Sequence, residues 1–221
     1  MRKGFTLIEL LTVIGIIGIL AAILIPTVAK VRQSANNNRT RAQFSQWITA
    51  METFKQEYGY YPDLNVDRER AAASGDAAFR LETERVRENF IEILTGRKVN
   101  GDRFDDNPFY RNHPNRRRVS FYAFSENELD FSSGSNVPYI VDAFGNNDIV
   151  IVIDRTGNGI IDQEDLDGSD LPTVSPRENT GVSGRPNLPA RGIRAGVIIY
   201  SAGHFASTDS EVAENLVKSW E

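Results

Sequence analysis

The chain has 221 residues, with 25 lysines and arginines against 30 aspartates and glutamates, and no cysteine. Its net charge of -5 argues against a nucleic-acid partner, because such proteins concentrate positive charge. Without cysteine there are no disulfides, so a domain outside the cytoplasm must be stabilised by its core, by partners or by metal. About 160 residues follow the first helical segment, which is enough for one core.

The first predicted element is an apolar segment at residues 10–28, preceded by Arg2 and Lys3. A helix of about nineteen residues rises roughly 28 Å, close to the hydrocarbon thickness of a bilayer. No small-residue cleavage site follows Pro26, which argues against a secretory signal peptide. The positive-inside rule therefore predicts a single membrane span, with the N-terminus cytoplasmic and the remainder outside.

Glu9 places a carboxylate in this apolar zone. A carboxylate at the centre of a membrane helix costs roughly 2.5 to 3.5 kcal/mol, so such groups are normally paired. Lys3 is the local candidate for a partner, and snorkelling of Glu9 to the lipid headgroups is the plain structural alternative.

The sequence Gly-Phe-Thr-Leu-Ile-Glu-Leu at residues 4–10 resembles the processing site of type IV prepilins and type II secretion pseudopilins. The resemblance implies a leader at residues 1–4, which a prepilin peptidase in the membrane removes by cutting after Gly4, and N-methylation of Phe5. It also implies a helical filament of identical subunits, built at an inner-membrane assembly platform. Cleavage creates an ammonium group on Phe5, and Glu9 is the acid near enough to neutralise it in a neighbouring subunit.

Residues 5–28 are thus predicted as the membrane-spanning and filament-core helix, and residues 29–61 as its amphipathic continuation. Gly59 is a predicted C-cap, and Pro62 prevents further helix. The apolar residues of the continuation recur at spacings of three and four, which predicts one face packed on a globular head. They are Phe44, Trp47, Ile48, Met51, Phe54 and Tyr58.

Residues 62–221 are predicted to form an α+β head of pilin-like fold, with a small antiparallel sheet. A second helix is expected at 76–96, and a strand at 119–124. Residues 137–166 are expected to hold strands and an Asp-rich turn, the β-branched run 149–153 being the strongest strand signal. A loop at 167–192 and a last strand and tail at 193–221 follow. The sequence Asp-Ala-Phe-Gly-Asn at 142–146 resembles the turn before the sheet in major pseudopilins.

The Asp-rich turn, residues 154–165, has the oxygen spacing of an EF-hand calcium loop, with Gly159 at the sharp bend. A metal-free β-hairpin at Asn158-Gly159, between strand 149–153 and Ile160-Ile161, explains the same residues. The acidic loop of Asp209 and Glu211 is a second candidate for calcium. The predicted ligands of the first site are Asp154, Thr156, Asn158, Asp162, Asp165 and the carbonyl of Ile160.

No enzyme signature is present: the sequence lacks a cysteine nucleophile, a phosphate-binding glycine loop and a hydrolase elbow. His113 and His204 have no metal-ligand spacing and are expected on the surface. The basic cluster Arg116-Arg117-Arg118 is predicted to be a solvated loop, with a docking patch for an anionic partner as the alternative.

These features together predict a non-enzymatic structural subunit of a pseudopilus or type IV pilus. We expect it in the cytoplasmic membrane, and after assembly in a periplasmic or extracellular filament. The alternative is a permanently anchored calcium-binding or adhesive display protein that never polymerises. A leader that ends in Gly4 separates the two, because a permanent anchor has no use for it.

Overall fold

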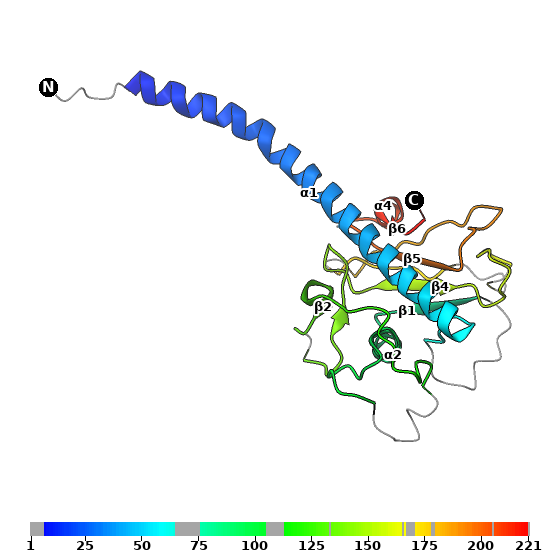
Figure 1. Cartoon of the computed structure of the whole chain (residues 1–221). Helices are drawn as coiled ribbons and strands as arrows, with labels where there is room; N and C mark the ends of the chain where they lie inside the picture. Colours follow the sequence, from blue (N-terminus) through cyan, green and yellow to red (C-terminus); the bar gives the residue numbers. More distant parts are fainter. Residues whose placement is uncertain are drawn as a thin grey trace. The chain divides into compact units, whose positions relative to one another are not determined.

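The computed structural model describes residues 7–64, 76–104, 113–132, 134–164, 166, 171–177, 180–204 and 206–220. The chain forms two compact units, Met1–Asn38 and Arg39–Glu221, which we describe separately. Helix α1 (Leu7–Tyr58) begins in the first unit and ends in the second (Figure 1). It ends at Gly59, whose φ of 84° is left-handed and whose N–H donates to the carbonyl of Lys55, as the glycine predicted.

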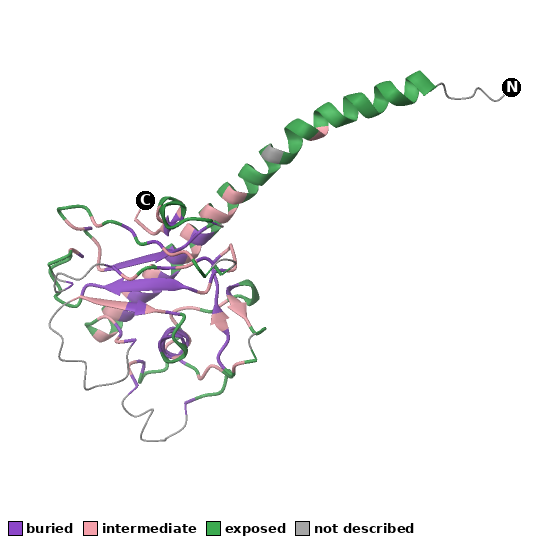
Figure 2. Cartoon of the chain, turned by 180° about the vertical axis from the view of Figure 1, so that it is seen from behind, coloured by how far each residue is buried: buried purple, intermediate pink, exposed green. Residues whose placement is uncertain are grey.

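In the second unit, called the head below, the last five turns of α1 supply one side of the core. The predicted apolar stripe is confirmed, because Phe44, Trp47, Met51 and Phe54 are fully buried. Figure 2 shows the change from an exposed to a buried helix along α1. The Trp47 ring meets Phe90 edge to face at 5.5 Å, a favoured geometry for aromatic pairs.

The head contains one four-stranded antiparallel sheet in the order β1-β4-β5-β6. Its strands are β1 (Ala77–Arg80), β4 (Ile149–Ile153), β5 (Val197–Ser201) and β6 (Val217–Lys218). Ile151 at the centre of β4 pairs with Phe79 on one side and Ile199 on the other. The strand predicted at 149–153 is therefore confirmed as a central strand.

Both faces of this sheet are covered, which explains why β4 reads as a continuous apolar run instead of an alternating one. Ile149, Ile151 and Ile153 face the core that α1 shares with α2 (Glu84–Thr95). Val150 and Val152 face a second core, built from the loops after β4 and from α4 (Asp209–Asn215). A smaller antiparallel pair, β2 (Leu129–Asp130) and β3 (Tyr139–Ile140), follows the 3-10 turn η2 (Glu126–Glu128).

The helix predicted at 76–96 is wrong in its first third, because residues 77–80 form β1 and α2 begins only at Glu84. Ala-Ala-Phe-Arg favours a helix locally, but the open edge of β4 needs a hydrogen-bonding partner, and Phe79 fills the core from the strand. The predicted end is confirmed: Gly96 is the C-cap, with a left-handed φ of 67°.

Three further expectations are corrected. Residues 119–124 form no ladder; the N–H groups of Phe121 and Tyr122 instead donate to the carbonyl of Leu94 at the end of α2. The strand 197–201 is not the last, since β6 pairs with its outer edge. The Asn158-Gly159 hairpin is absent from the described residues, because Ile161 pairs with Ile193 and not with β4. The α+β class, with a long N-terminal helix followed by an antiparallel sheet, is confirmed.

Candidate functional site

The first unit is the candidate site for membrane and filament contacts. The large apolar side chains of residues 7–31 are exposed, with between 46% and 85% of their surface accessible to solvent. Among the described residues α1 is the one helix long and apolar enough to cross a membrane, by length and composition. A continuous apolar surface of this extent is unfavourable in water, so it requires lipid or other protein around it.

The hydroxyl groups in this segment are satisfied within the helix. Thr12 donates to the carbonyls of Ile8 and Glu9, both at 3.0 Å, and Thr27 donates to the carbonyls of Ile23 and Leu24. This internal bonding suits an environment without water, where an unsatisfied polar group is costly. Glu9 is the acidic residue in the first turn of α1. Gly4 and Phe5, the predicted processing site, lie outside the described residues.

The predicted calcium loop follows β4, and its first residue is buried. Asp154 is 3% exposed. Its Oδ1 accepts hydrogen bonds from the Gly157 N–H at 2.6 Å and the Thr156 hydroxyl at 3.0 Å, and its Oδ2 accepts one from the Gly159 N–H at 2.8 Å. The carboxylate therefore organises its own loop.

The other predicted ligands also bond locally. Asn158 Oδ1 accepts from the Ile160 N–H, and Asp162 Oδ1 from the Glu164 N–H. Asp165 lies outside the described residues. Within the described ones no group of three His, Cys, Asp or Glu side chains is placed to hold a metal. Asp154, Asn158 and Asp162 thus each accept backbone N–H groups of their own turns.

The second calcium candidate likewise holds its own loop together. Asp209 Oδ1 accepts from the Ser183 N–H at 2.7 Å, and Glu211 accepts from the N–H and hydroxyl of Ser207. Thr208 caps α4 by accepting from the Glu211 N–H. These contacts join the C-terminal loop to the segment around Ser183.

Calcium binding stays a prediction, and the structure sharpens its test. Asp154→Ala should lower the free energy of unfolding of the head by about 1 to 3 kcal/mol without any calcium, because three donors of the loop lose their buried acceptor. Asp154→Asn, which keeps one acceptor oxygen, should cost less. Chemical unfolding with calcium or with a chelator measures both effects. A wild-type head stabilised by calcium, together with an Asp154→Ala head that is not, would assign the metal to this loop.

The turn at residues 142–146, noted above for its sequence resemblance, connects two parts of the head. Asp142 is 3% exposed, and its carboxylate accepts hydrogen bonds from the Ser201 hydroxyl and the N–H groups of Phe144 and Asn146. Asn146 Nδ2 donates to the carbonyl of Gly203 at 2.6 Å. The turn before β4 is thereby tied to the end of β5, which no local sequence signal could specify.

A groove of about 820 Å³ runs beside α1 between Arg39 and Gln46, and sequence analysis did not foresee it. Its opposite wall comes from residues 122–128 and 141–145. Glu128 lies in this wall and accepts hydrogen bonds from Trp47 Nε1, the Tyr122 hydroxyl and the Ser125 N–H. Because its carboxylate is already so well bonded, we assign it to anchoring the wall onto α1.

The prediction that His113 is a surface residue is wrong, since its side chain is buried against Glu92; His204 is exposed, as expected. His113 Nε2 lies 3.7 Å from Glu92 Oε2, while its Nδ1 accepts from the Asn115 N–H at 3.1 Å. The neutral ring therefore carries its proton on Nε2, facing Glu92. Burial raises the pKa of Glu92 to about 7 and lowers the pKa of His113 to about 4.

These two pKa shifts have opposite effects on stability. Folded Glu92 retains a proton that the unfolded chain has lost between pH 4.5 and about 7, so this residue alone makes stability fall as pH rises through that window. Folded His113 lacks a proton that the unfolded chain binds between pH 6.5 and about 4, so it alone makes stability fall as pH falls. Where the windows overlap, the pair holds one proton in both states and the slopes cancel.

We therefore expect this pair to contribute little to the pH dependence of the wild type, and two single variants to depart from the wild type with opposite slopes. Glu92→Gln should lose up to about 3 kcal/mol of unfolding free energy between pH 7 and 4.5, whereas His113→Asn should lose a similar amount in the other direction. Urea unfolding of the head at a series of pH values measures this. Parallel curves for wild type and both variants would refute the neutral pair.

The comparisons with known proteins concern the amino-terminal part. The family described as the prokaryotic N-terminal methylation motif matches residues 1–25. A type IV major pilin protein of Myxococcus xanthus is 41% identical over 63 residues, which are 28% of this chain and 29% of the pilin. A type IV wide pilus major component of Thermus thermophilus is 44% identical over 59 residues, 27% of this chain and 45% of the relative.

A type II secretion system core protein G of Escherichia coli is 30% identical over 64 residues, 29% of this chain and 44% of the relative. The chain thus spans less than half the length of these relatives. No solved structure matches the chain. The resemblance to type IV prepilins and type II secretion pseudopilins is confirmed for the amino-terminal segment.

Proposed function

We propose that this protein is a structural subunit of a filament of the type IV pilus or type II secretion class, processed by prepilin peptidase and polymerised through α1. The observation that carries the proposal is a methylation motif at residues 1–25 that overlaps the first part of α1, whose large apolar side chains are exposed. The relatives with which this segment was compared are a major pilin, a major component of a wide pilus and a core protein of a secretion system.

The physical properties of the first unit suit both states of such a subunit. In the membrane, the apolar face of α1 is covered by lipid, and the hydroxyls of Thr12 and Thr27 need no outside partner. In a filament, the same surface is covered by the helices of other copies. An added Cβ at Gly15 or Gly18 would have no atom of another part of the chain within 4 Å, so a neighbouring helix can approach closely there.

Glu9 provides specificity in this proposal. Processing after Gly4 puts an ammonium group on Phe5, and the Glu9 carboxylate of an adjacent copy neutralises it. An ion pair in a low-dielectric environment depends strongly on position, so it selects one register among otherwise interchangeable apolar contacts. Arg2 and Lys3 keep the leader on the cytoplasmic side, and the head lies outside.

The decisive experiment for the proposal is the mass of the mature chain in cells that possess the peptidase. We expect a chain that begins at Phe5 and carries one added methyl group, and an uncleaved chain for Gly4→Leu, because the bulkier residue blocks the cut. Thr6→Val, next to the cut but without a proposed role, is the control and should be processed. An intact wild-type leader would contradict the filament proposal and favour a fixed anchor.

A further inference from the structure

We propose that the head carries a basic pole and an acidic pole at opposite ends, and that the basic pole of one copy binds the acidic pole of the next. This contact deepens the proposed function, because it would add a head-to-tail interface to the packing of α1. Its partner is a second copy of this chain. The basic pole is defined by residues 96–104 and 113–119, and the acidic pole by residues 206–217.

The basic pole concentrates charge that the rest of the chain lacks. Its two segments hold six cations and one carboxylate, that of Asp102, in a chain with a net charge of -5. The cations that are exposed include Arg97, Arg103 and the Arg116 to Arg118 cluster. The cations of the two segments are Arg97, Lys98, Arg103, Arg116, Arg117 and Arg118.

The two segments form one surface around the end of α2. The backbone of Arg118 lies directly against Gly96, where an added Cβ would come within 2.7 Å of the Arg118 carbonyl carbon. The rings of Phe104 and His113 are in contact at 4.5 Å. Asn115 Nδ2 donates to the carbonyl of Ile93, which binds the second segment to the helix end. The six cations therefore belong to one folded patch.

Part of the positive charge of this patch is not used in ion pairs within the head. The last carbonyls of α2 already have backbone and amide donors, so they need no arginine as a cap: Ile93 accepts from Asn115, and Leu94 from Phe121 and Tyr122. Arg117 pairs with Glu57 at the end of α1. Among the ion pairs of the described residues, none involves Arg103, Arg116 or Arg118. Their charge is available to a partner.

The backbone holds the arginine cluster in a fixed turn. Arg118 has a φ of 59°, in the left-handed region, and it is the one non-glycine residue with a positive φ among those described. This conformation is unfavourable for a residue with a Cβ, so the surroundings must impose it. Hydrogen bonds from the Arg118 N–H to the Asn115 carbonyl, and between Val119 and the Asn115 side chain, do so.

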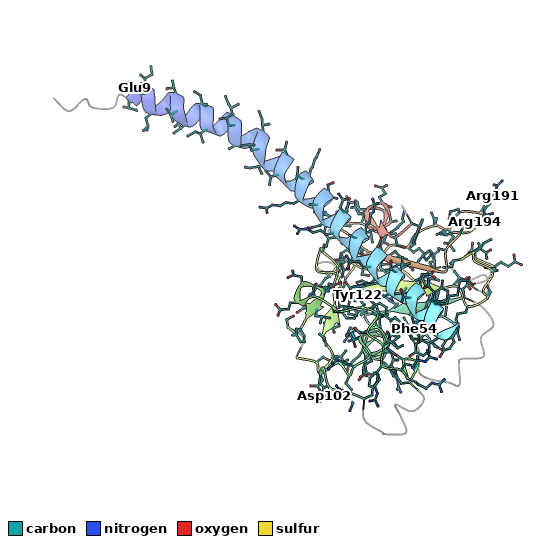
Figure 3. The ribbon with its side chains drawn as sticks, viewed as in Figure 1. Glu9, Phe54, Asp102, Tyr122, Arg191 and Arg194 are labelled. Carbon is teal, nitrogen blue, oxygen red and sulfur yellow. The ribbon has the colours of Figure 1, made fainter. Side chains whose placement is uncertain are left out.

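The acidic pole is complementary in charge and lies at the other end of the head. Residues 206–217 hold three carboxylates and no cation: Asp209, Glu211 and Glu214. All three side chains are exposed, and they lie on or at the start of α4. Figure 3 shows Asp102 of the basic pole at the lower end of the head, whereas Figure 1 shows α4 at the upper end in the same view.

Opposite charges on opposite ends favour one mode of association. Two basic poles or two acidic poles repel each other, so a symmetric pair of copies through either pole is disfavoured. A head-to-tail contact leaves one pole free on each outer copy, and contacts of this kind generate open helical filaments when the rotation between copies does not close a ring. The symmetry of the contact therefore matches the assembly proposed for α1.

Cross-linking in the full-length, membrane-embedded protein tests this contact directly. The chain has no cysteine, so Arg116→Cys with Glu214→Cys introduces two defined attachment points, one on each pole. A short bis-maleimide reagent should give a ladder of dimers, trimers and larger species. The matched control is Arg191→Cys with Glu214→Cys, in which Arg116 is kept. Arg191 is an exposed arginine away from the basic pole (Figure 3). The ladder of this control should be at least about tenfold weaker.

Charge reversal supplies the second arm. Arg103→Glu with Arg118→Glu, added to the cysteine pair, should weaken the ladder at least about tenfold. Adding Ser210→Lys on the acidic pole of the same variant, which still carries Glu214→Cys, should partly restore the ladder. Arg191→Glu with Arg194→Glu imposes the same total change in charge and should have little effect. Unchanged unfolding midpoints show that the variants remain folded.

The outcomes separate this inference from the proposed function. A ladder without sheared filaments would support the poles and contradict the filament proposal. Three results would each overturn the contact between the poles. The first is filaments whose cross-linked ladder is no stronger than that of the Arg191 control, and the second is dimers without larger species. The third is a ladder that Arg103→Glu with Arg118→Glu does not weaken. Loss of DNA binding on charge reversal, with no ladder in the wild type, would overturn them in favour of a nucleic-acid surface.

Discussion

Glu9→Val is expected to leave the protein in the membrane while reducing its recovery in sheared filaments by at least about tenfold, equivalent to about 1.4 kcal/mol per subunit contact. Membrane insertion should be unchanged or improved, because the substitution removes a carboxylate that costs roughly 2.5 to 3.5 kcal/mol in an apolar zone. Assembly should fall because the ammonium group of Phe5 in a neighbouring copy loses its counterion.

Thr12→Val is the matched control for this prediction. It also replaces a polar group by an apolar one in the same helix, but the Thr12 hydroxyl bonds only to the carbonyls of Ile8 and Glu9. Its recovery should equal that of wild type. The measurement is the ratio of subunit in the sheared fraction to subunit in the membrane. If Glu9→Val and Thr12→Val were recovered equally, pairing with Phe5 would have no part in assembly.

Gly203→Ala is expected to destabilise the head by more than about 4 kcal/mol, which few single substitutions do. Two effects add. Gly203 has a φ of 70°, where a residue with a Cβ is strained by roughly 1 to 2 kcal/mol. The new Cβ would also lie 2.1 Å from the carbonyl oxygen of Asn215, which is backbone and cannot rotate away. The end of α4 and strand β6 would have to move.

Gly59→Ala isolates the first of these effects. Gly59 has a similar left-handed φ of 84°, but nothing lies within 4 Å of an added Cβ. This variant should therefore lose only about 1 kcal/mol. Urea unfolding of the head gives both values. A Gly203→Ala head as stable as Gly59→Ala would mean that β6 and α4 are not held where the structure places them.

The parts of this protein that depend on local pattern could be predicted from its sequence. The apolar run from residue 10 to 28 indicated a membrane-length helix, the three- and four-residue spacing of Phe44 to Tyr58 indicated its packed face, and Gly59 and Gly96 marked two helix ends. The motif at residues 4–10 identified the family resemblance. Each of these signals is contained within a few turns of chain, so no distant residue is needed to interpret it.

The features that depend on residues far apart in the chain could not be predicted in this way and became clear from the packed fold. Residues 77–80 are a strand because β4 offers them a hydrogen-bonding edge, although their composition favours a helix. His113 is buried because Glu92 and Phe104 surround it. The hairpin at Asn158-Gly159 does not form, because Ile161 pairs with Ile193, far along the chain. Hydrogen-bond satisfaction and burial are properties of the whole fold, and for these residues they outweigh local propensity.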